Sequence, residues 1–295
     1  KFPKQMTMGA MQNDTLVYQM GKQVAAHCKR IGVHVNFAPV LDVNNNPNNP
    51  VINYRSFGED RENVSRKGIQ YINGLQDNGI MANGKHFPGH GDTDMDSHKS
   101  LPTVPHDRKR LDSVELYPFR NAFRAGLASI MVAHLQVPEL DDTPNLATTL
   151  SPKVVAELLK NEMEFEGLVF TDALNMKGVS SYFEPGEVDV KALLAGNDVL
   201  LFSEDVPTAI AKIKEAIDNK EISEREITKR VVKILTHKVK FNASTFSNLS
   251  KIKLSSDLNN TSAELVRRRI YEEALTVIKN NEGVLPLKQL ANKKY

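Results

Sequence analysis

The segment Lys85–His98 (KHFPGHGDTDMDSH) concentrates side chains that can do chemistry. It holds three of the eight histidines of the chain, together with three aspartates and one lysine. One proline and two glycines interrupt regular helix or strand, so we expect a loop after the dipeptide Lys85-His86. A loop of this composition suits either metal binding or acid–base catalysis.

Metal binding is the first of these two chemistries. Imidazole and carboxylate groups are common ligands of divalent metal ions. They recur at every second position of the loop, at His90, Asp92, Asp94, Asp96 and His98. Alternate residues of an extended chain spread along one line, so these five meet at one ion only if the loop folds tightly. A metal-dependent hydrolase that uses the His90–His98 loop therefore stays open as an alternative.

Acid–base catalysis is the second, and we favour it. Asp96 and His98 are two residues apart, which places both side chains on the same side of a short extended stretch. A carboxylate in that position orients the imidazole and raises its pKa. The ring could then donate a proton near neutral pH.

Further polar side chains stand at the ends of apolar runs. Asp172 closes the run LVFTD, where an unpaired charge would be costly, so we expect either a pocket with cations or a helix N-cap. Arg55 lies in NYRSFGED, and its planar guanidinium suits the hydroxyls or carboxylates of a ligand. Asp42 and His134 follow two other apolar runs. His134 fits a buried structural histidine as well as a substrate contact.

Short apolar runs with the composition of strands alternate with helical patterns. The runs are Val33–Val40, Gly79–His86, Ala128–His134, Gly167–Asp172 and Asp198–Phe202. This alternation predicts an α/β fold with a parallel sheet and crossover helices. A closed barrel gathers the carboxyl ends of many strands around one pocket. Because polar candidates end four of these runs, we predict a (β/α)8 TIM-like barrel, incomplete at its N-terminal strand.

The helical patterns give the remaining elements and the domain organisation. The expected helices are Leu16–Ile31, Glu62–Asn78, Ser113–Ala125, Pro152–Met163, Val188–Ala195, Val206–Asn219, Ser223–His237 and Ala263–Lys279. We expect residues 1–240 to form the catalytic barrel. Residues 241–295 then form a linker and a helix that lead toward a C-terminal α/β domain, with Phe241–Asn260 as a surface connection and Gly283–Lys288 extended.

Composition narrows the classes of partner. Of the 295 residues, 40% are hydrophobic, which is typical of a globular chain. The net charge of +2 is too small to attract the chain strongly to nucleic acid. The single cysteine excludes an internal disulfide and a zinc–thiolate cluster. No apolar stretch approaches the roughly 20 residues of a membrane helix. We expect no nucleic-acid partner, no membrane span and a monomer.

Several of these segments together resemble glycoside hydrolase family 3, in its bacterial β-N-acetylglucosaminidase branch. The motif KHFPGHG…DSH is highly specific, and the other β-glucosidase-type branches of the family lack the Asp-Ser-His loop. The segments that carry the resemblance are VNFAPVLDVNNNP (Val35–Pro47), YRSFGED (Tyr54–Asp60), GKHFPGHGDTDMDSHKSLP (Gly84–Pro102), MVAH (Met131–His134), ATTLSP (Ala147–Pro152) and VFTDALNMKGV (Val169–Val179).

The resemblance implies a role for each candidate residue. Asp172 matches the catalytic nucleophile, His98 the general acid/base, and Asp96 its dyad partner. The residues that match or adjoin the substrate-binding positions are Arg55, Lys85, His86, Asp42 and His134. No cofactor and no metal are implied.

The function that the resemblance implies is a retaining exo-β-N-acetylglucosaminidase. It would cleave terminal N-acetylglucosaminides, expected to be peptidoglycan fragments (muropeptides), through a covalent glycosyl-enzyme. A first barrel strand before the segment Lys1–Ala10 and a further α/β domain after the linker are also implied. A sugar-binding barrel without turnover remains the second alternative.

Overall fold

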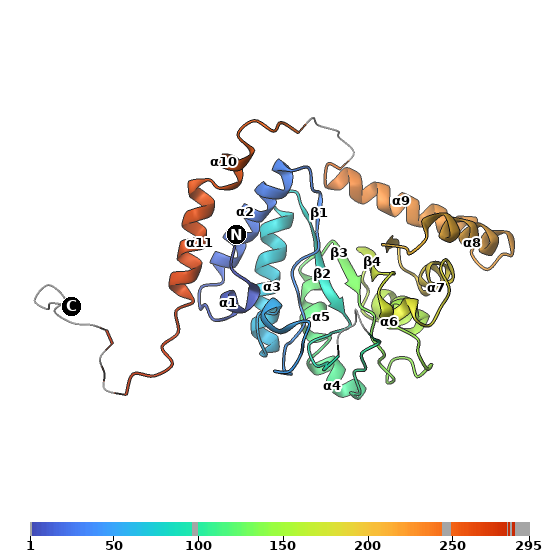
Figure 1. The fold of residues 1–295 in the computed structure, drawn as a ribbon, viewed down its shortest axis with the longest axis horizontal. Helices are drawn as coiled ribbons and strands as arrows, with labels where there is room; N and C mark the ends of the chain where they lie inside the picture. The colour runs from blue at the N-terminus through green and yellow to red at the C-terminus, as the bar shows by residue number, and fades with distance from the viewer. Residues whose placement is uncertain (1, 96–99, 244–248, 282, 284, 287–295) are drawn as a thin grey trace, which may run out of the picture.

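The architecture is a parallel sheet of five strands curled into a half-barrel and covered by helices (Figure 1). The computed structural model describes residues 2–95, 100–243, 249–281, 283 and 285–286. The strands lie side by side in chain order, as β1 (Val35–Asn36), β2 (Met81–Phe87), β3 (Ser129–Val132), β4 (Leu168–Ala173) and β5 (Val199–Leu201). Every pairing is parallel. The predicted α/β, TIM-like barrel class is confirmed.

All five predicted strands are present, but the first is much shorter than expected. It was predicted over Val33–Val40, whereas pairing with β2 stops at Asn36 and resumes only as a single bridge between Val40 and Lys85. Pro39 lies in this gap and has no backbone N–H to offer a neighbouring strand. The chain still follows β2, because the backbone N–H of Leu41 donates to the Lys85 carbonyl at 2.6 Å.

The helices on the β1 side of the sheet form one layer, in which α11 lies against α2 and α2 lies against α3 (Figure 1). The helices of this side are α1 (Gln5–Gly9), α2 (Thr15–Arg30), η1 (Asn53–Arg55), α3 (Arg61–Gln76), α4 (Arg108–Ser113), α5 (Tyr117–Arg124), α10 (Leu254–Leu258) and α11 (Thr261–Glu273). Those of the other side are η2 (Thr148–Leu150), the π-helix η3 (Lys153–Glu162), α6 (Lys177–Ser180), α7 (Glu187–Ala195), α8 (Val206–Asp218) and α9 (Glu224–Lys240).

Side-chain caps explain where several of these helices begin. A side-chain oxygen at the residue before the helix accepts a hydrogen bond from a backbone N–H of the first turn. The capping residues are Asp60, Asp107, Asp205, Ser223 and Asn260. Asp107 starts α4, a helix that the sequence analysis missed. The predicted helix Ser113–Ala125 begins only at Tyr117.

The crossing of α2 and α3 depends on two glycines. A Cβ on Gly74 would lie 2.4 Å from the Tyr18 carbonyl oxygen, and one on Gly21 would lie 2.9 Å from that of Tyr71. Both distances are too short for real atoms, so the helix backbones touch. One large apolar core lies between these helices and the sheet.

The C-terminal segment returns to this layer. Arg30 at the end of α2 pairs with Asp257 of α10 at 2.7 Å, and Ile270 of α11 joins the main core. The predicted helix Ala263–Lys279 ends earlier, at Glu273, where the following apolar side chains are exposed and have no surface to pack against. Half of the predicted extended segment Gly283–Lys288 lies outside the described residues.

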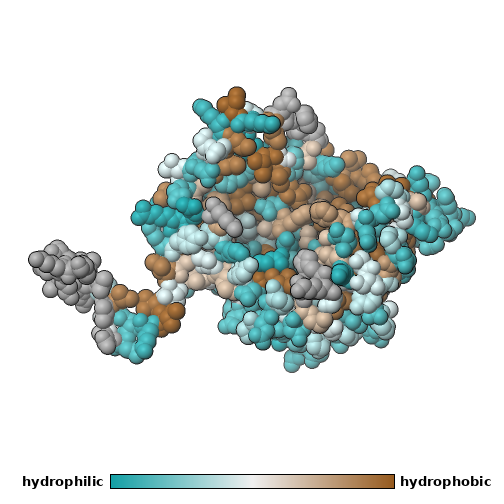
Figure 2. Space-filling model, in the orientation of Figure 1, coloured by the Kyte–Doolittle hydropathy of each residue, from teal (hydrophilic) through white to brown (hydrophobic). Residues whose placement is uncertain are grey.

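Exposed apolar side chains occur at several places on the described surface, and one group of them belongs to α9. Hydrophobic side chains gather toward α9 on the face that Figure 2 shows. Val231, Val232, Leu235 and Val239 of this helix are exposed. No helix of the described part of the chain combines the length and apolar character needed to cross a membrane.

Candidate active site

A cleft of about 260 Å³ opens at the carboxyl ends of the strands. It is lined by Phe37, Val51, Arg55, Lys85, His86, His90, Met131, Asp172, Ala173, Leu201 and Phe202. Four of the predicted site residues, contributed by three separate segments of the chain, therefore face the same space. Sequence alone placed each at a strand end or on a neighbouring loop, and the parallel sheet brings those ends together.

Asp172 is the carboxylate of the cleft. It lies next to the last residue of β4, and its Oδ1 accepts the backbone N–H of Ala173 at 2.8 Å. Burial alone would raise the pKa of Asp172. The positive charge of Lys85, and of His86 and His134 when protonated, acts with the Ala173 N–H to lower this pKa below its ordinary value. The carboxylate is therefore ionised at neutral pH.

A relay of hydrogen bonds runs from Asp42 through His86 to Arg55. His86 Nδ1 lies 2.7 Å from Asp42 Oδ2, and His86 Nε2 lies 3.2 Å from Arg55 Nη2. A guanidinium only donates hydrogen bonds, so we assign the ring proton to Nδ1, which donates to Asp42, while Nε2 accepts from Arg55. Asp42 thus fixes the tautomer of the histidine that orients the arginine.

Asp42 itself is fully buried and does not line the cleft. Its Oδ1 accepts the backbone N–H of His90 at 2.7 Å, in addition to the bonds from His86. Burial would raise the pKa of Asp42, but the hydrogen bonds from His86 and His90, and the charges of these rings when they are protonated, lower it overall. Asp42 therefore lies behind the cleft and holds two of the residues that line it, His86 and His90.

Lys85 precedes His86 at the end of β2 and faces the cleft. Burial and the nearby charge of Arg55 lower the pKa of the Lys85 ammonium, whereas the carboxylates of Asp172 and Asp42 raise it. The net direction is downward. This ammonium and the Arg55 guanidinium supply the hydrogen-bond donors of the cleft beside Asp172.

His134 lies at the end of β3 and is also fully buried. Its Nδ1 is 2.8 Å from Thr149 Oγ1, and its Nε2 is 3.0 Å from the carbonyl oxygen of Ala173. Since a carbonyl only accepts, Nε2 donates. His134 therefore supports the backbone next to Asp172 from beneath.

His90 is a cleft residue that the sequence analysis considered only as a metal ligand. Its Nδ1 lies 2.8 Å from Thr93 Oγ1. Burial, together with the charge of His86, lowers the pKa of His90 to about 4, so the ring is neutral at physiological pH. The sequence signal was its place in KHFPGHG, one turn of the loop away from His86. Asp96 and His98, the predicted dyad, lie outside the described residues.

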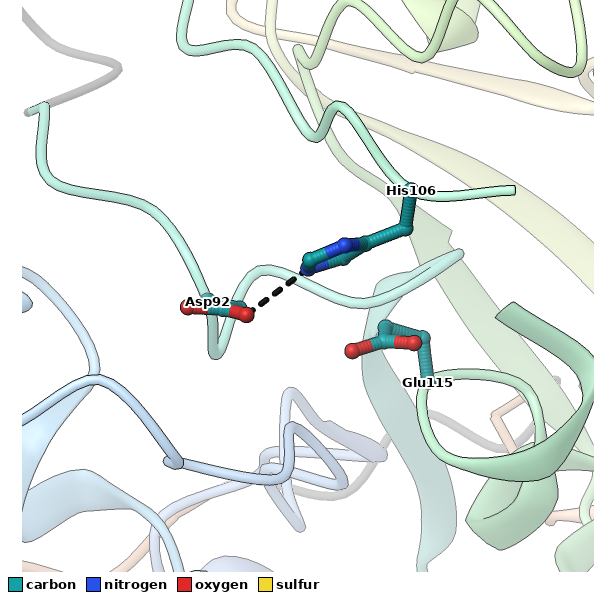
Figure 3. Close-up of side chains that lie close together, drawn as sticks. All are labelled: Asp92, His106 and Glu115. Carbon is teal, nitrogen blue, oxygen red and sulfur yellow. Dashed lines mark hydrogen bonds and ion pairs between the residues drawn. The ribbon is translucent and has the colours of Figure 1, made fainter. Parts of the chain in front are cut away.

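A second cluster of titratable groups lies beside the loop, formed by Asp92, His106 and Glu115 (Figure 3). One ligand atom from each lies within 4.8 Å of the others, and in the described part of the chain no other such group could hold a metal ion. Arg110 Nη2 already contacts both carboxylates, at 3.4 Å from Asp92 Oδ2 and 3.2 Å from Glu115 Oε1. The donor set therefore fits an ion-pair network better than a metal.

A comparison with known families identifies the family of the chain. The profile described as "Glycosyl hydrolase family 3 N terminal domain" matches residues 1–237. The chain belongs to glycoside hydrolase family 3. The family resemblance inferred from KHFPGHG…DSH and the other motifs is thus confirmed.

Similarity to curated proteins and to solved structures supports the same family assignment. The chain is 33% identical to beta-hexosaminidase A of Pseudoalteromonas piscicida, over 98% of this chain and 52% of that protein. It is 38% identical to a family 3 beta-N-acetylglucosaminidase structure from Paenibacillus sp. str. FPU-7, with a TM-score of 0.88 over 92% of this chain and 52% of that one.

A relative from Neisseria meningitidis serogroup C (strain 053442), named beta-hexosaminidase, is 32% identical over 74% of this chain and 60% of its own length. The chain thus spans about half of the length of the first curated relatives that it matches.

Proposed function

We propose that this chain forms the catalytic barrel of a retaining exo-β-N-acetylglucosaminidase, with Asp172 as the nucleophile. The observation that carries the proposal is the ionised Asp172 at the end of β4, in one cleft with Lys85, His86 and Arg55. Relatives named beta-hexosaminidase and beta-N-acetylglucosaminidase support the choice of an N-acetylglucosaminide as substrate. Peptidoglycan fragments are the natural substrate class that we expect.

The proposed reaction has two displacements at the anomeric carbon. In the first, Asp172 attacks that carbon while His98, held by Asp96, protonates the departing oxygen. In the second, the same imidazole, now neutral, removes a proton from water, which displaces Asp172. Two inversions give net retention, through transition states with oxocarbenium character.

The cations of the cleft have a binding role in this proposal. Arg55 and Lys85 donate to the hydroxyls of the terminal sugar, and His86 keeps the guanidinium in place. Asp42 and His134 act from behind, on His86 and on the backbone beside Asp172. These roles are consistent with the burial of Asp42 and His134, because only Arg55 and Lys85 need to reach the substrate.

The deciding experiment is the substitution Asp172→Asn in the full protein. We expect turnover of an aryl N-acetylglucosaminide to fall by at least about 1,000-fold, since loss of a catalytic nucleophile in other hydrolases is that severe. Asp142→Asn is the matched control, because the Asp142 side chain is 87% exposed and far less constrained. Unchanged turnover in Asp172→Asn would remove the nucleophile assignment.

Two further outcomes separate the alternatives. A wild-type protein that binds N-acetylglucosamine tightly and hydrolyses no glycoside would be a sugar-binding barrel. Activity that disappears on chelation and returns with a divalent metal would favour the metal-dependent hydrolase. We expect chelation to leave turnover unchanged.

A further inference from the structure

A second pocket, lined mainly by charged side chains, lies between η3, α7 and α9. Its volume is about 320 Å³. Four basic side chains and two acidic side chains line it, so it carries an excess of positive charge. The basic residues are Lys160, Lys229, Arg230 and Lys233, and the acidic residues are Asp198 and Glu226.

This basic pocket lies at the amino ends of the strands, opposite the cleft that contains Asp172. Asp198 directly precedes β5, and its backbone N–H donates to the Val169 carbonyl at 2.8 Å. Val169 is the second residue of β4, and its own N–H donates to Asp198 Oδ2 at 2.9 Å. The two pockets share no lining residue among those described. A ligand of the basic pocket would therefore not compete with the sugar.

Asp198 is the buried carboxylate of the basic pocket, and two ammonium groups already share it. Its Oδ1 lies 3.1 Å from Lys160 Nζ, and its Oδ2 lies 2.7 Å from Lys233 Nζ. The Asp198 side chain is only 2% exposed, and both of its oxygens are occupied by these contacts and the backbone of Val169. One negative charge thus serves two positive charges, which leaves little capacity for a third.

Arg230 is this third cation, and it lacks a hydrogen-bond partner where it needs one. Its Nη1 is buried and has no acceptor among the described residues. Burial lowers the pKa of Arg230, against the charges of Asp198 and Glu226. A buried polar nitrogen without an acceptor is costly. An anion bound beside Arg230 would supply the missing acceptor.

The basic groups also repel one another. Burial lowers the pKa of Lys160, and the charges of Lys233 and Arg230 add to this effect, whereas the Asp198 carboxylate opposes it. The net direction is downward, although Lys160 Nζ lies only 3.1 Å from that carboxylate. Further negative charge in the basic pocket would therefore relieve repulsion as well as satisfy Arg230.

We propose that the basic pocket binds a phosphate group, with Arg230 and Lys229 as its main donors. A guanidinium presents paired N–H groups to an oxyanion, and an ammonium adds a compact charge. The excess of four basic over two acidic side chains matches a dianion, which a single carboxylate would only half supply. The group belongs either to inorganic phosphate or to a phosphate monoester, since both present the same oxygens.

The test measures binding to the full protein by isothermal titration calorimetry, without any sugar present. The probes are inorganic phosphate and glycerol 3-phosphate, each compared with sodium chloride at the same ionic strength. Arg230→Gln removes the guanidinium, and Lys229→Gln repeats the test at an exposed position. Lys238→Gln is the matched control, because it removes one positive charge from the same helix at an exposed residue outside the basic pocket.

We expect saturable binding of at least one probe, with a Kd of about 1 mM or lower. Arg230→Gln should weaken it by about 10-fold or more, the effect of one lost hydrogen bond to a charged group. Lys229→Gln should weaken it in the same direction, and Lys238→Gln should change it less than about 2-fold. The probe with the lower Kd distinguishes free phosphate from a monoester.

Thermal unfolding gives a second readout, which a structural role for Arg230 would not produce. Without phosphate, Arg230→Gln should have a Tm equal to or above that of the wild type, because the substitution removes a charge that lacks a partner. With the anion at about tenfold its Kd, the Tm of the wild type should rise by about 2–4 °C, and that of Arg230→Gln should not.

Three results would overturn the proposal. The first is the absence of saturable binding of either probe to the wild type. The second is equally tight binding to Arg230→Gln and Lys229→Gln. The third is a lower Tm of Arg230→Gln in phosphate-free buffer, which would make the guanidinium part of a structural ion-pair network. All three are measured without turnover, so they leave the proposed glycosidase function untouched.

Discussion

Asp42 does not line the cleft, but its hydrogen bonds orient residues that do. It accepts the Nδ1–H of His86 and so leaves the Nε2 lone pair free to accept from Arg55. The sequence placed Asp42 at the end of an apolar run, among the candidate substrate contacts. Its complete burial depends on the loop after β2 folding over it, which spacing alone does not encode.

Replacing this carboxylate tests the relay. In Asp42→Asn, the side-chain amide places a donor against His86 Nδ1, which favours the other tautomer and turns a second N–H toward Arg55. We expect kcat/KM on an aryl N-acetylglucosaminide to fall about 10–100-fold, the equivalent of an unpaired buried donor at about 1–3 kcal/mol. Circular dichroism should show that the variant is folded.

A wild-type kcat/KM in folded Asp42→Asn would contradict the relay. The comparison variant is Thr143→Val, which removes a hydroxyl that pairs with Asp141 and lies outside the residues lining the cleft. It should leave kcat/KM unchanged.

Some of the other site residues could be predicted from the local sequence, and others could not. Asp172 was predictable, since a carboxylate that closes an apolar strand needs a specific environment. His106 and Glu115 were not, because their meeting with Asp92 depends on how α4 and the chain after it pack beside the loop. The roles given to Asp96 and His98 remain predictions.

At the scale of elements, a buried ion pair fixes α3 to the start of α2. Lys67 is fully buried, and its Nζ lies 2.5 Å from Asp14 Oδ1 and 2.7 Å from the Met11 carbonyl oxygen. Arg66 contacts the same carboxylate at 3.1 Å from the exposed side of the helix. Adjacent residues of one helix thus offer a buried and an exposed version of one interaction.

These two residues form a matched pair for measurement. Lys67→Ala should lower the free energy of unfolding by about 3 kcal/mol, since it leaves a partly buried carboxylate and a carbonyl without their partner. Arg66→Ala should cost less than about 1 kcal/mol, because solvent screens an exposed ion pair. Urea denaturation measures both, and equal costs would contradict the assigned burial.

The same pair predicts a pH dependence. Burial would raise the pKa of Asp14, but hydrogen bonds and charges of Lys67 and Arg66 lower it overall. A carboxyl whose folded pKa lies below its unfolded value of about 3.9 stabilises the fold above that pH. The contribution is lost as the pH falls through the folded pKa.

We therefore expect the free energy of unfolding of the wild type to fall more steeply below about pH 4 than that of Asp14→Asn. Urea titrations over a pH series give both curves. Parallel curves would show that Asp14 titrates alike in the folded and unfolded chains.

The sequence predicted the order of strands and most helices because each has a local signal, namely apolar period, caps and breaks. Element ends were less predictable. The shortening of β1 depends on Pro39 facing a partner strand, and the end of α11 depends on where the surface that it covers ends.

For the molecule as a whole, the C-terminal helix is part of the packed layer. Ile270 of α11 is fully buried in the main core, although residues 241–295 were expected to be a linker and helix leading onward. The helical pattern of Ala263–Lys279 predicted a helix here but could not indicate that α11 packs against α2. The proposed boundary at residue 240 therefore separates a catalytic part from a connecting part, although the two parts share one packed core.

Two substitutions in α11 test this docking. Ile270→Ala should lower the free energy of unfolding by about 2–4 kcal/mol, the usual cost of truncating a buried aliphatic side chain. Leu265→Ala, on the same helix but 46% exposed, should cost less than about 1 kcal/mol. Equally small losses would mean that α11 does not cover α2 in solution.

The contact of α2 with α3 through Gly21 and Gly74 limits the substitutions that this helix layer can accept. An exchange of glycine for alanine usually favours a helix, yet here the added methyl would force the two axes apart. The displacement would reach α11 on one flank and β2, with Lys85 and His86, on the other. In a library that randomises these two sites, we expect selection for activity to recover glycine at both, so helix propensity would be a misleading guide to improving this barrel.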